Sequence, residues 1–99
     1  MANTADGAAT IQIKVLFFAS AREAAGGVSQ IELLLPEATA TTAVVRQTLA
    51  ERYPGALATM VLDEVSITFA VNEEYLSPNQ VLRLKNGDTV ALIPPISGG

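Results

Sequence analysis

Apolar and polar residues alternate in four stretches of this chain, as they do in strands that bury only one face. The stretches are residues 11–18, 28–36, 64–72 and 89–93. The side chains that we expect to face a core are Ile11, Ile13, Val15, Phe17, Ile31, Leu33, Leu35, Ile67, Phe69, Val71, Val90 and Leu92. The pattern therefore predicts four strands, each with one buried face.

One further stretch, TTAVVRQTLAERYPG at residues 41–55, follows a helical period instead. Val45, Leu49 and Tyr53 recur every four residues and so share one face of a helix. A threonine at the start of the stretch can cap the helix, and the Pro-Gly pair at its end terminates it. This is the one stretch that predicts a long helix.

The predicted order is strand, strand, helix, strand, irregular segment, strand, which is an α+β order. Gly26-Gly27, between the first two strands, suits a hairpin with an elaborate loop. A ferredoxin-like arrangement would need a second full helix, and residues 73–88, with their proline and their Asn-Gly turn, do not supply one. We therefore predict a β-grasp: a mixed sheet with one main helix packed on one face.

The ends of the chain differ from its middle. Residues 1–10 are small and polar with no periodicity, so we expect a flexible N-terminal arm. Residues 11–93 then form the β-grasp domain, and residues 94–99 form an extended Gly-Gly tail.

If the helix covers one face of the sheet, no helix covers the other. The side chains that the strands direct to that second face are mostly apolar: Leu16, Phe18, Thr68, Ala70, Ala91 and Ile93. Single exposed apolar residues are common, but several on one sheet face usually mark an interface. We expect a partner protein to bind there.

Composition removes most kinds of chemistry from the chain. It contains no cysteine and no histidine, so a thiol nucleophile, a catalytic triad and a zinc site are excluded. With six Lys and Arg and a net charge of −4, we expect neither nucleic acid nor a membrane as partner. The start of the chain resembles no signal peptide, so we expect a cytosolic protein.

The remaining charged residues do not assemble into an obvious active site. Asp63-Glu64 and Glu73-Glu74 could act as an acid/base couple, but adjacent acids near strand ends are far more often solvated turn residues. Three arginines are assigned to local ion pairs or to a partner: Arg22, Arg46 and Arg52. We expect no metal site.

The tail PPISGG is the other candidate site. Pro94 and Pro95 fix φ and lack backbone N–H donors, so they end sheet pairing and project the chain outward. Gly98 and Gly99 have no side chains and could enter a channel too narrow for a Cβ atom. A frayed terminus would look the same, but adenylation of the Gly99 carboxylate would make it an electrophile for sulfur or an amine.

Three segments together resemble one known family: IKVLFFASARE, FAVNEEY and, most specifically, NGDTVALIPPISGG. They are similar to the sulfur-carrying small subunits of molybdopterin synthase, in the MoaD/ThiS group of ubiquitin-like proteins. The resemblance covers residues 11–99 and implies a β-grasp fold with no catalytic centre of its own.

The resemblance also implies a reaction cycle. An E1-like enzyme uses ATP to adenylate the Gly99 carboxylate, and a sulfur donor then converts the adenylate to a thiocarboxylate. The tail, with Pro94, Pro95, Ile96, Ser97, Gly98 and Gly99, enters the large synthase subunit and donates sulfur to cyclic pyranopterin monophosphate. Two small and two large subunits form a heterotetramer, and the small subunit itself binds no cofactor.

Within this resemblance, Phe18, Tyr75 and Ile93 fall where the family has interface hydrophobics, and Arg22 is a possible polar contact beside them. Leu16 and Ala70 complete the predicted partner interface. Three alternatives stay open: a sulfur carrier for thiamine synthesis, a ubiquitin-like modifier that forms isopeptide bonds through the same glycine, and a plain binding module with a frayed end.

Overall fold

The computed structural model describes residues 9–63 and 67–95 of the chain. They form nine elements in the order β2 (Thr10–Phe17), α1 (Ala19–Ala24), β3 (Gln30–Pro36), η1 (Glu37–Thr39, a 3-10 turn), α2 (Thr42–Arg52), α3 (Ala56–Leu62), β4 (Thr68–Val71), β5 (Glu74–Tyr75) and β6 (Thr89–Ile93). Strands thus occur in all four stretches that alternate in the sequence.

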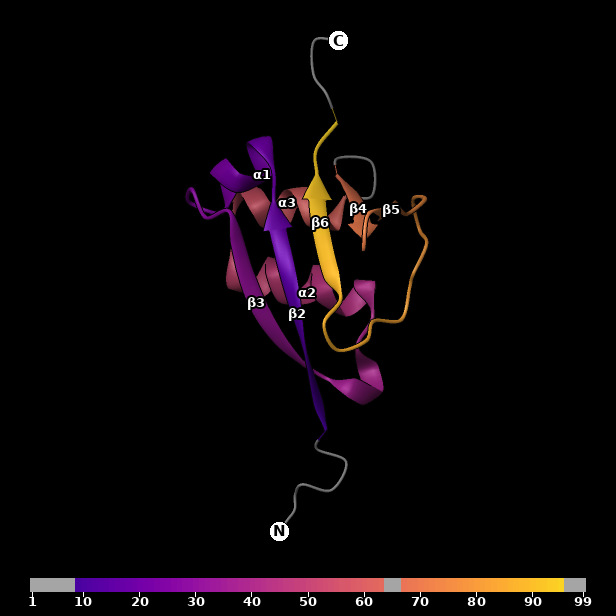
Figure 1. Cartoon of the computed structure of the whole chain (residues 1–99). Coiled ribbons are helices and arrows are strands. Elements are labelled where there is room, and N and C mark those ends of the chain that lie inside the picture. Colours follow the sequence, from indigo (N-terminus) through magenta and orange to yellow (C-terminus); the bar gives the residue numbers. More distant parts are fainter. Residues whose placement is uncertain (1–8, 64–66, 96–99) are drawn as a thin grey trace.

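The strands form one mixed sheet in the order β3-β2-β6-β4-β5 (Figure 1). β2 and β6, far apart in the sequence, pair in parallel at the centre, and the neighbouring pairs are antiparallel. Parallel neighbours need a long crossover connection, and here the helices lie within that connection. This topology confirms the predicted β-grasp.

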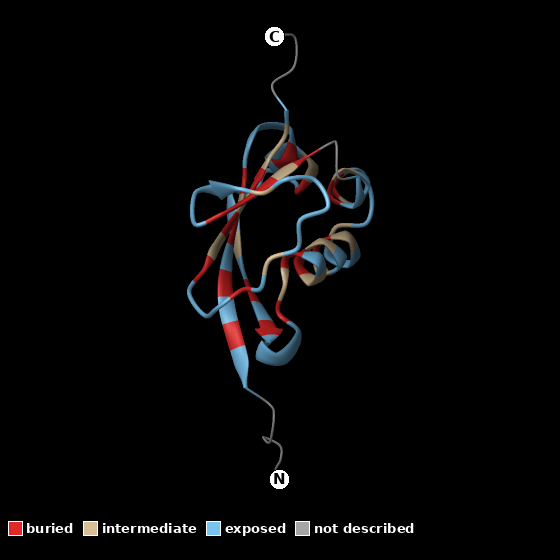
Figure 2. Cartoon of the chain, turned by 90° about the vertical axis from the view of Figure 1, so that its right-hand side faces the viewer, coloured by how far each residue is buried: buried red, intermediate tan, exposed pale blue. Residues whose placement is uncertain are grey.

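The two longer helices, α2 and α3, lie against one face of this sheet, as the edge-on view shows (Figure 2). Buried residues alternate with mostly exposed ones along β2 and with half-buried ones along β6, and the buried set faces the helices. The side chains of Val15, Val90 and Leu92 are fully buried there. The core therefore lies between the sheet and the helices, where the apolar alternation predicts it.

The longest helix, α2, has the ends expected from the sequence. Thr41 is its N-cap, and the Thr41 hydroxyl accepts a hydrogen bond of 3.3 Å from the backbone N–H of Val44. Val45 and Leu49 are fully buried against the sheet, and Tyr53 packs edge-on against Phe17 with ring centroids 5.9 Å apart. The predicted apolar stripe is the buried face of α2.

The second helix of the layer, α3, was not predicted. It starts directly after Gly55, whose φ of +144° suits a residue without a Cβ atom. Leu57 and Val61, four residues apart, are fully buried. The Pro-Gly pair ends α2 as expected, but it is a corner between two helices and not the start of a loop.

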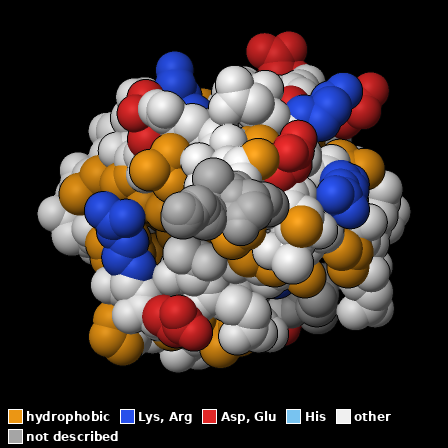
Figure 3. All heavy atoms as spheres, turned by 90° about the horizontal axis from the view of Figure 1, so that it is seen from below, with side chains coloured by type: hydrophobic (Ala, Val, Ile, Leu, Met, Phe, Trp, Pro, Cys, Tyr) orange, Lys and Arg blue, Asp and Glu red, His pale blue; other side chains and the backbone are white. Residues whose placement is uncertain are grey.

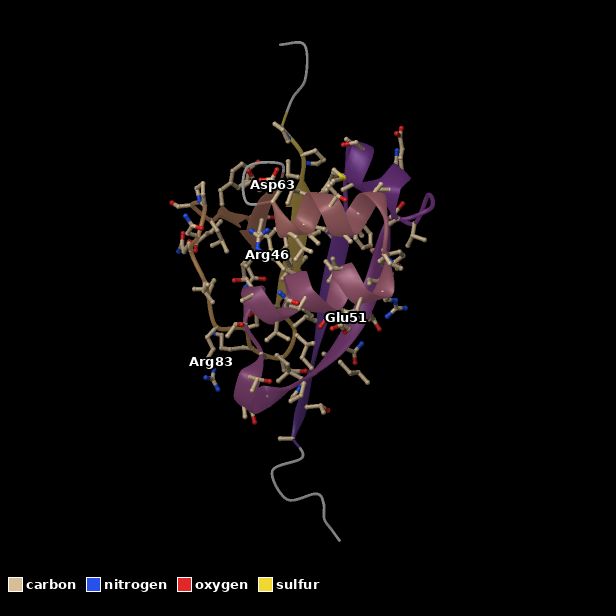
Figure 4. All side chains as sticks on the ribbon, turned by 180° about the vertical axis from the view of Figure 1, so that it is seen from behind. Arg46, Glu51, Asp63 and Arg83 are labelled. Carbon is tan, nitrogen blue, oxygen red and sulfur yellow. The ribbon has the colours of Figure 1, made fainter. Side chains whose placement is uncertain are left out.

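Arg46 of α2 ties the two helices together. Its Nη1 atom donates a 2.6 Å hydrogen bond to the Val61 carbonyl in the last turn of α3, and its guanidinium carbon lies 4.1 Å from the centre of the Phe69 ring (Figure 4). A cation at a helix C-terminus is also favoured by the helix dipole. Arg46 therefore has a local structural role, because it links α2 to α3 and to the sheet.

The described strands and helices run from Thr10 to Ile93. β2 begins at Thr10, one residue before the predicted start of the domain, and β6 ends at Ile93. The third strand begins at Thr68, while residues 64–66 lie outside the described residues. Most of the predicted arm and residues 96–99 of the predicted tail also lie outside them.

Candidate functional site

The face of the sheet opposite the helices carries a hollow. Its shape follows from the strand register. Leu16 of β2 pairs with Ala91 of β6, Ala91 pairs with Ala70 of β4, and Ala70 pairs with Tyr75 of β5. Side chains of directly paired residues lie on the same face. Two alanines therefore form the middle of this row, and a large side chain stands at each end.

We call this depression the open-face hollow. Its volume is about 610 Å³, and its lining consists of Leu16, Phe18, Ala70, Asn72, Glu73, Tyr75, Thr89, Ala91 and Ile93. The structure thus brings five of the six predicted interface residues together. The sixth, Arg22, is exposed on α1 and does not line the hollow.

Exposure differs sharply among these residues. The side chains of Tyr75 and Phe18 are 71% and 46% exposed, which is unusual for large aromatic residues. Ala70 is only 2% exposed, although its side chain is on the open face as predicted. Its methyl group is short and lies between Ala91 and Tyr75 in register, so it forms the floor of the hollow.

One side of the hollow is polar, which the alternation along the strands did not predict. Asn72 belongs to the two-residue turn between β4 and β5. Its Nδ2 atom donates to Asp88 Oδ1 at 3.0 Å, and its Oδ1 atom accepts from the backbone N–H of Thr89 at 3.0 Å. The second oxygen of Asp88 accepts from the backbone N–H of Lys85 at 2.8 Å. These bonds attach the turn to the start of β6.

The open-face hollow extends to the end of the sheet from which the tail departs. Ile93, at the rim, is the last residue of β6, and half-buried Pro94 and exposed Pro95 follow it. Ile96, Ser97, Gly98 and Gly99 lie outside the described residues. A protein that contacts the hollow would therefore also lie beside the start of the tail.

The opposite end of the molecule has a different surface. Acidic and basic side chains are interspersed there with apolar ones (Figure 3). The two acid pairs, which were expected to be solvated, lie near strand ends. Asp63 is exposed and Glu64 lies outside the described residues, while Glu73 is exposed in the hairpin turn and Glu74 is exposed at the start of β5.

The hollow contains few groups that could do chemistry. Apart from the Tyr75 hydroxyl, Glu73 is the one ionisable side chain that the described part of the chain contributes to its lining. Within residues 9–63 and 67–95 no three His, Cys, Asp or Glu side chains gather as metal ligands would. No helix in the same ranges is long and apolar enough to span a membrane. The arrangement suits the binding of another protein's apolar surface.

The fold and the hollow define a class of protein. A mixed sheet with parallel central strands from the two ends of the chain, and a helix layer on one face, is the β-grasp of ubiquitin-like proteins. Within this class the chain belongs to the ThiS family, whose model matches residues 15–99.

Individual proteins resemble the chain over nearly its whole length. A Chlamydomonas reinhardtii protein named molybdopterin synthase sulfur carrier subunit is 43% identical over 91 residues, which cover 90% of this chain and 100% of that protein. A Haloferax volcanii protein of known solution structure has a TM-score of 0.74 at 27% identity, over 91% of this chain and 88% of its own. The small archaeal modifier protein 1 of Methanosarcina acetivorans has a TM-score of 0.67 at 27% identity, over 92% of this chain and 99% of its own.

Proposed function

We propose that this protein is the sulfur carrier subunit of a molybdopterin synthase and acts in molybdenum cofactor biosynthesis. The observation that carries the proposal is the 43% identity to the Chlamydomonas reinhardtii carrier, which extends over the full length of that protein. The chain supplies the sulfur-bearing group and no catalytic centre. The transfer itself takes place on the partner subunits.

Sulfur would be carried on the Gly99 carboxylate. The sequence contains no cysteine, so no side-chain thiol can hold the sulfur. The carboxylate attacks the α-phosphorus of ATP on an E1-like enzyme, which forms an acyl-adenylate and releases pyrophosphate. A sulfur donor of that pathway then displaces AMP, so that one carboxylate oxygen is replaced by sulfur. ATP and the sulfur donor belong to the activating partner, and this chain binds no cofactor.

The tail would deliver this sulfur to the large synthase subunit. Pro94 and Pro95 cannot extend the ladder of β6, because proline has no N–H donor. Gly98 and Gly99 are thin enough for a narrow channel that ends at cyclic pyranopterin monophosphate. Two small and two large subunits make the proposed heterotetramer, and we place the complex in the cytosol.

The open-face hollow would be the docking surface for the large subunit. Phe18 and Tyr75 are exposed aromatic residues, a type that often dominates binding energy at interfaces. Leu16, Ala70 and Ile93 complete the apolar part of this surface. Arg22 lies outside the hollow and would contact the partner only at the periphery of the interface.

The carrier role is tested at Gly99. Protein isolated from its native cells is analysed by mass spectrometry, and we expect a fraction with one oxygen replaced by sulfur at the C-terminus. A variant that lacks Gly98 and Gly99 should show no such fraction, should not support molybdopterin synthesis, and should keep the urea midpoint of the parent chain. Full activity of the truncated variant would contradict the proposal.

Docking is tested with Phe18→Asp and a matched control, Leu34→Asp. Both side chains are exposed, at 46% and 70%, but Leu34 is on β3 and outside the hollow. A buried interface aromatic contributes about 2 kcal/mol or more, so Phe18→Asp should weaken binding to the large subunit about 30-fold. Calorimetry should show that the Leu34→Asp variant binds the large subunit with the affinity of the parent chain. Equal effects of both variants would refute docking at the hollow.

A ubiquitin-like modifier would use the same terminal glycine, and the similarity to the archaeal modifier protein makes this the second candidate. It predicts that immunoblots of native cells with an antibody to this chain show ladders of larger adducts. These adducts would disappear in the Gly98-Gly99 truncation. A sulfur-substituted C-terminus without such adducts supports the carrier role alone.

A further inference from the structure

The turn between β4 and β5 contains a residue type that the backbone conformation at that position disfavours. Val71 pairs with Glu74, so the turn consists of Asn72 and Glu73 only. Both have positive φ, 50° and 75°. Two-residue turns of this kind favour Asn first and Gly second, because an L side chain is strained at positive φ. Glu73 occupies the position where glycine would fit without strain.

The two turn residues differ in what their side chains do for the fold. Asn72 bonds to Asp88 and to the backbone of Thr89, so its strained conformation is offset by contacts within the domain. Glu73 is exposed, and among the described residues its carboxylate makes no hydrogen bond or ion pair. The fold therefore gives no reason for a glutamate at this position.

The position of Glu73 suggests what the side chain is for. Among the described residues, Glu73 is the only carboxylate in the lining of the open-face hollow, and none of them contributes a lysine or arginine to it. Glu74 provides a contrast one residue away. It pairs with Val71, whose side chain is buried on the helix side of the sheet. Glu74 is therefore directed to the helix side as well, away from the hollow.

We propose that Glu73 determines partner specificity by pairing with a lysine or arginine of the large synthase subunit at the rim of the hollow. The inference rests on the proposed docking at this hollow. Apolar contacts alone would accept many partners, whereas a carboxylate at the rim favours a protein with a cation opposite and disfavours one without it. The strained turn is the cost to the isolated domain.

The experiment compares three variants of the full chain in binding to the large subunit, measured by calorimetry and stopped-flow kinetics. Glu73→Gln should weaken binding about fivefold, mainly through slower association, and should make the affinity less sensitive to added NaCl. Glu74→Gln removes the same net charge from the other face and should change the affinity much less. Glu73→Gly should also weaken binding, while it raises the thermal midpoint by about 4–8 °C.

The outcomes separate this inference from the proposed function. Weakening by Glu73→Gln but not by Glu74→Gln supports a specific pair at the rim. Equal effects of the two variants would mean that only net charge matters and would overturn the inference, as would full affinity of Glu73→Gln. Either result leaves docking at the hollow intact if Phe18→Asp weakens binding about 30-fold, as expected. If Phe18→Asp binds normally, the docking proposal itself fails.

Discussion

Replacement of Arg46 by methionine tests how α2 and α3 are held together. Methionine keeps an unbranched apolar side chain between the helices, but it removes the guanidinium group. The hydrogen bond of 2.6 Å to the Val61 carbonyl and the stacking at 4.1 Å on Phe69 are both lost. The Val61 carbonyl then has no side-chain donor at the end of α3. We expect a folded but markedly less stable protein.

The size of the effect follows from these two contacts. A hydrogen bond from a charged donor contributes about 1.5–3 kcal/mol. A half-buried cation–π contact adds about 0.5–2 kcal/mol. Because such terms overlap, we expect the free energy of unfolding to fall by about 2–4 kcal/mol. With an m-value of about 1.2 kcal/mol/M, the urea midpoint should fall by about 1.5–3.5 M.

Urea unfolding followed by circular dichroism measures this change. The matched control is Arg52→Met, at the exposed last residue of the same helix, which should change stability by less than about 0.5 kcal/mol. The reasoning is refuted if Arg46→Met unfolds within about 0.5 kcal/mol of the parent chain. It is also refuted if both variants lose equal stability, because the loss would then reflect charge and not the contacts of Arg46.

Three further predictions concern the hollow, the second helix and the hairpin turn. Ala91→Phe fills the middle of the open-face hollow and should abolish co-purification with the large subunit at an unchanged urea midpoint; retained co-purification would contradict docking there. Leu57→Ala removes a fully buried side chain of α3 and should cost about 2–4 kcal/mol in urea unfolding, whereas a loss below about 1 kcal/mol would show that α3 is not part of the core. Asn72→Ala removes the bonds to Asp88 and Thr89 and should cost about 1–3 kcal/mol, and an unchanged midpoint would show that the turn holds without them.

The strands and the main helix could be predicted because local pattern determines them. In 11–18 and 89–93 the alternation matches the observed burial, and the stripe of Val45 and Leu49 is the buried face of α2. The second helix could not be predicted in the same way. A short apolar run such as residues 56–62 fits a helix or a strand equally well, and it is packing of Leu57 and Val61 on the sheet that decides.

The site was predictable in its residues but not in its shape. Alternation places Leu16, Ala70 and Ile93 on the open face, yet a hollow requires that the two alanines meet across strands. That register depends on how four strands pair, which no single strand encodes. The polar rim was not predicted, because Asn72 was assigned to the end of the third strand and Glu73 to a pair of solvated acids. Asn72 could have indicated the turn, because asparagine is favoured at the first position of a two-residue hairpin turn.

The parallel pairing of β2 and β6 has a practical consequence for experiments on this protein. Because the two strands run side by side in the same direction, the first residue of β2 and the last residue of β6 are at opposite ends of the sheet (Figure 1). The eight residues of β2 span about 26 Å. A fluorophore attached at Ala9 is therefore separated by about that length from the hollow's rim at Ile93. Such a reporter can follow binding without obstructing it.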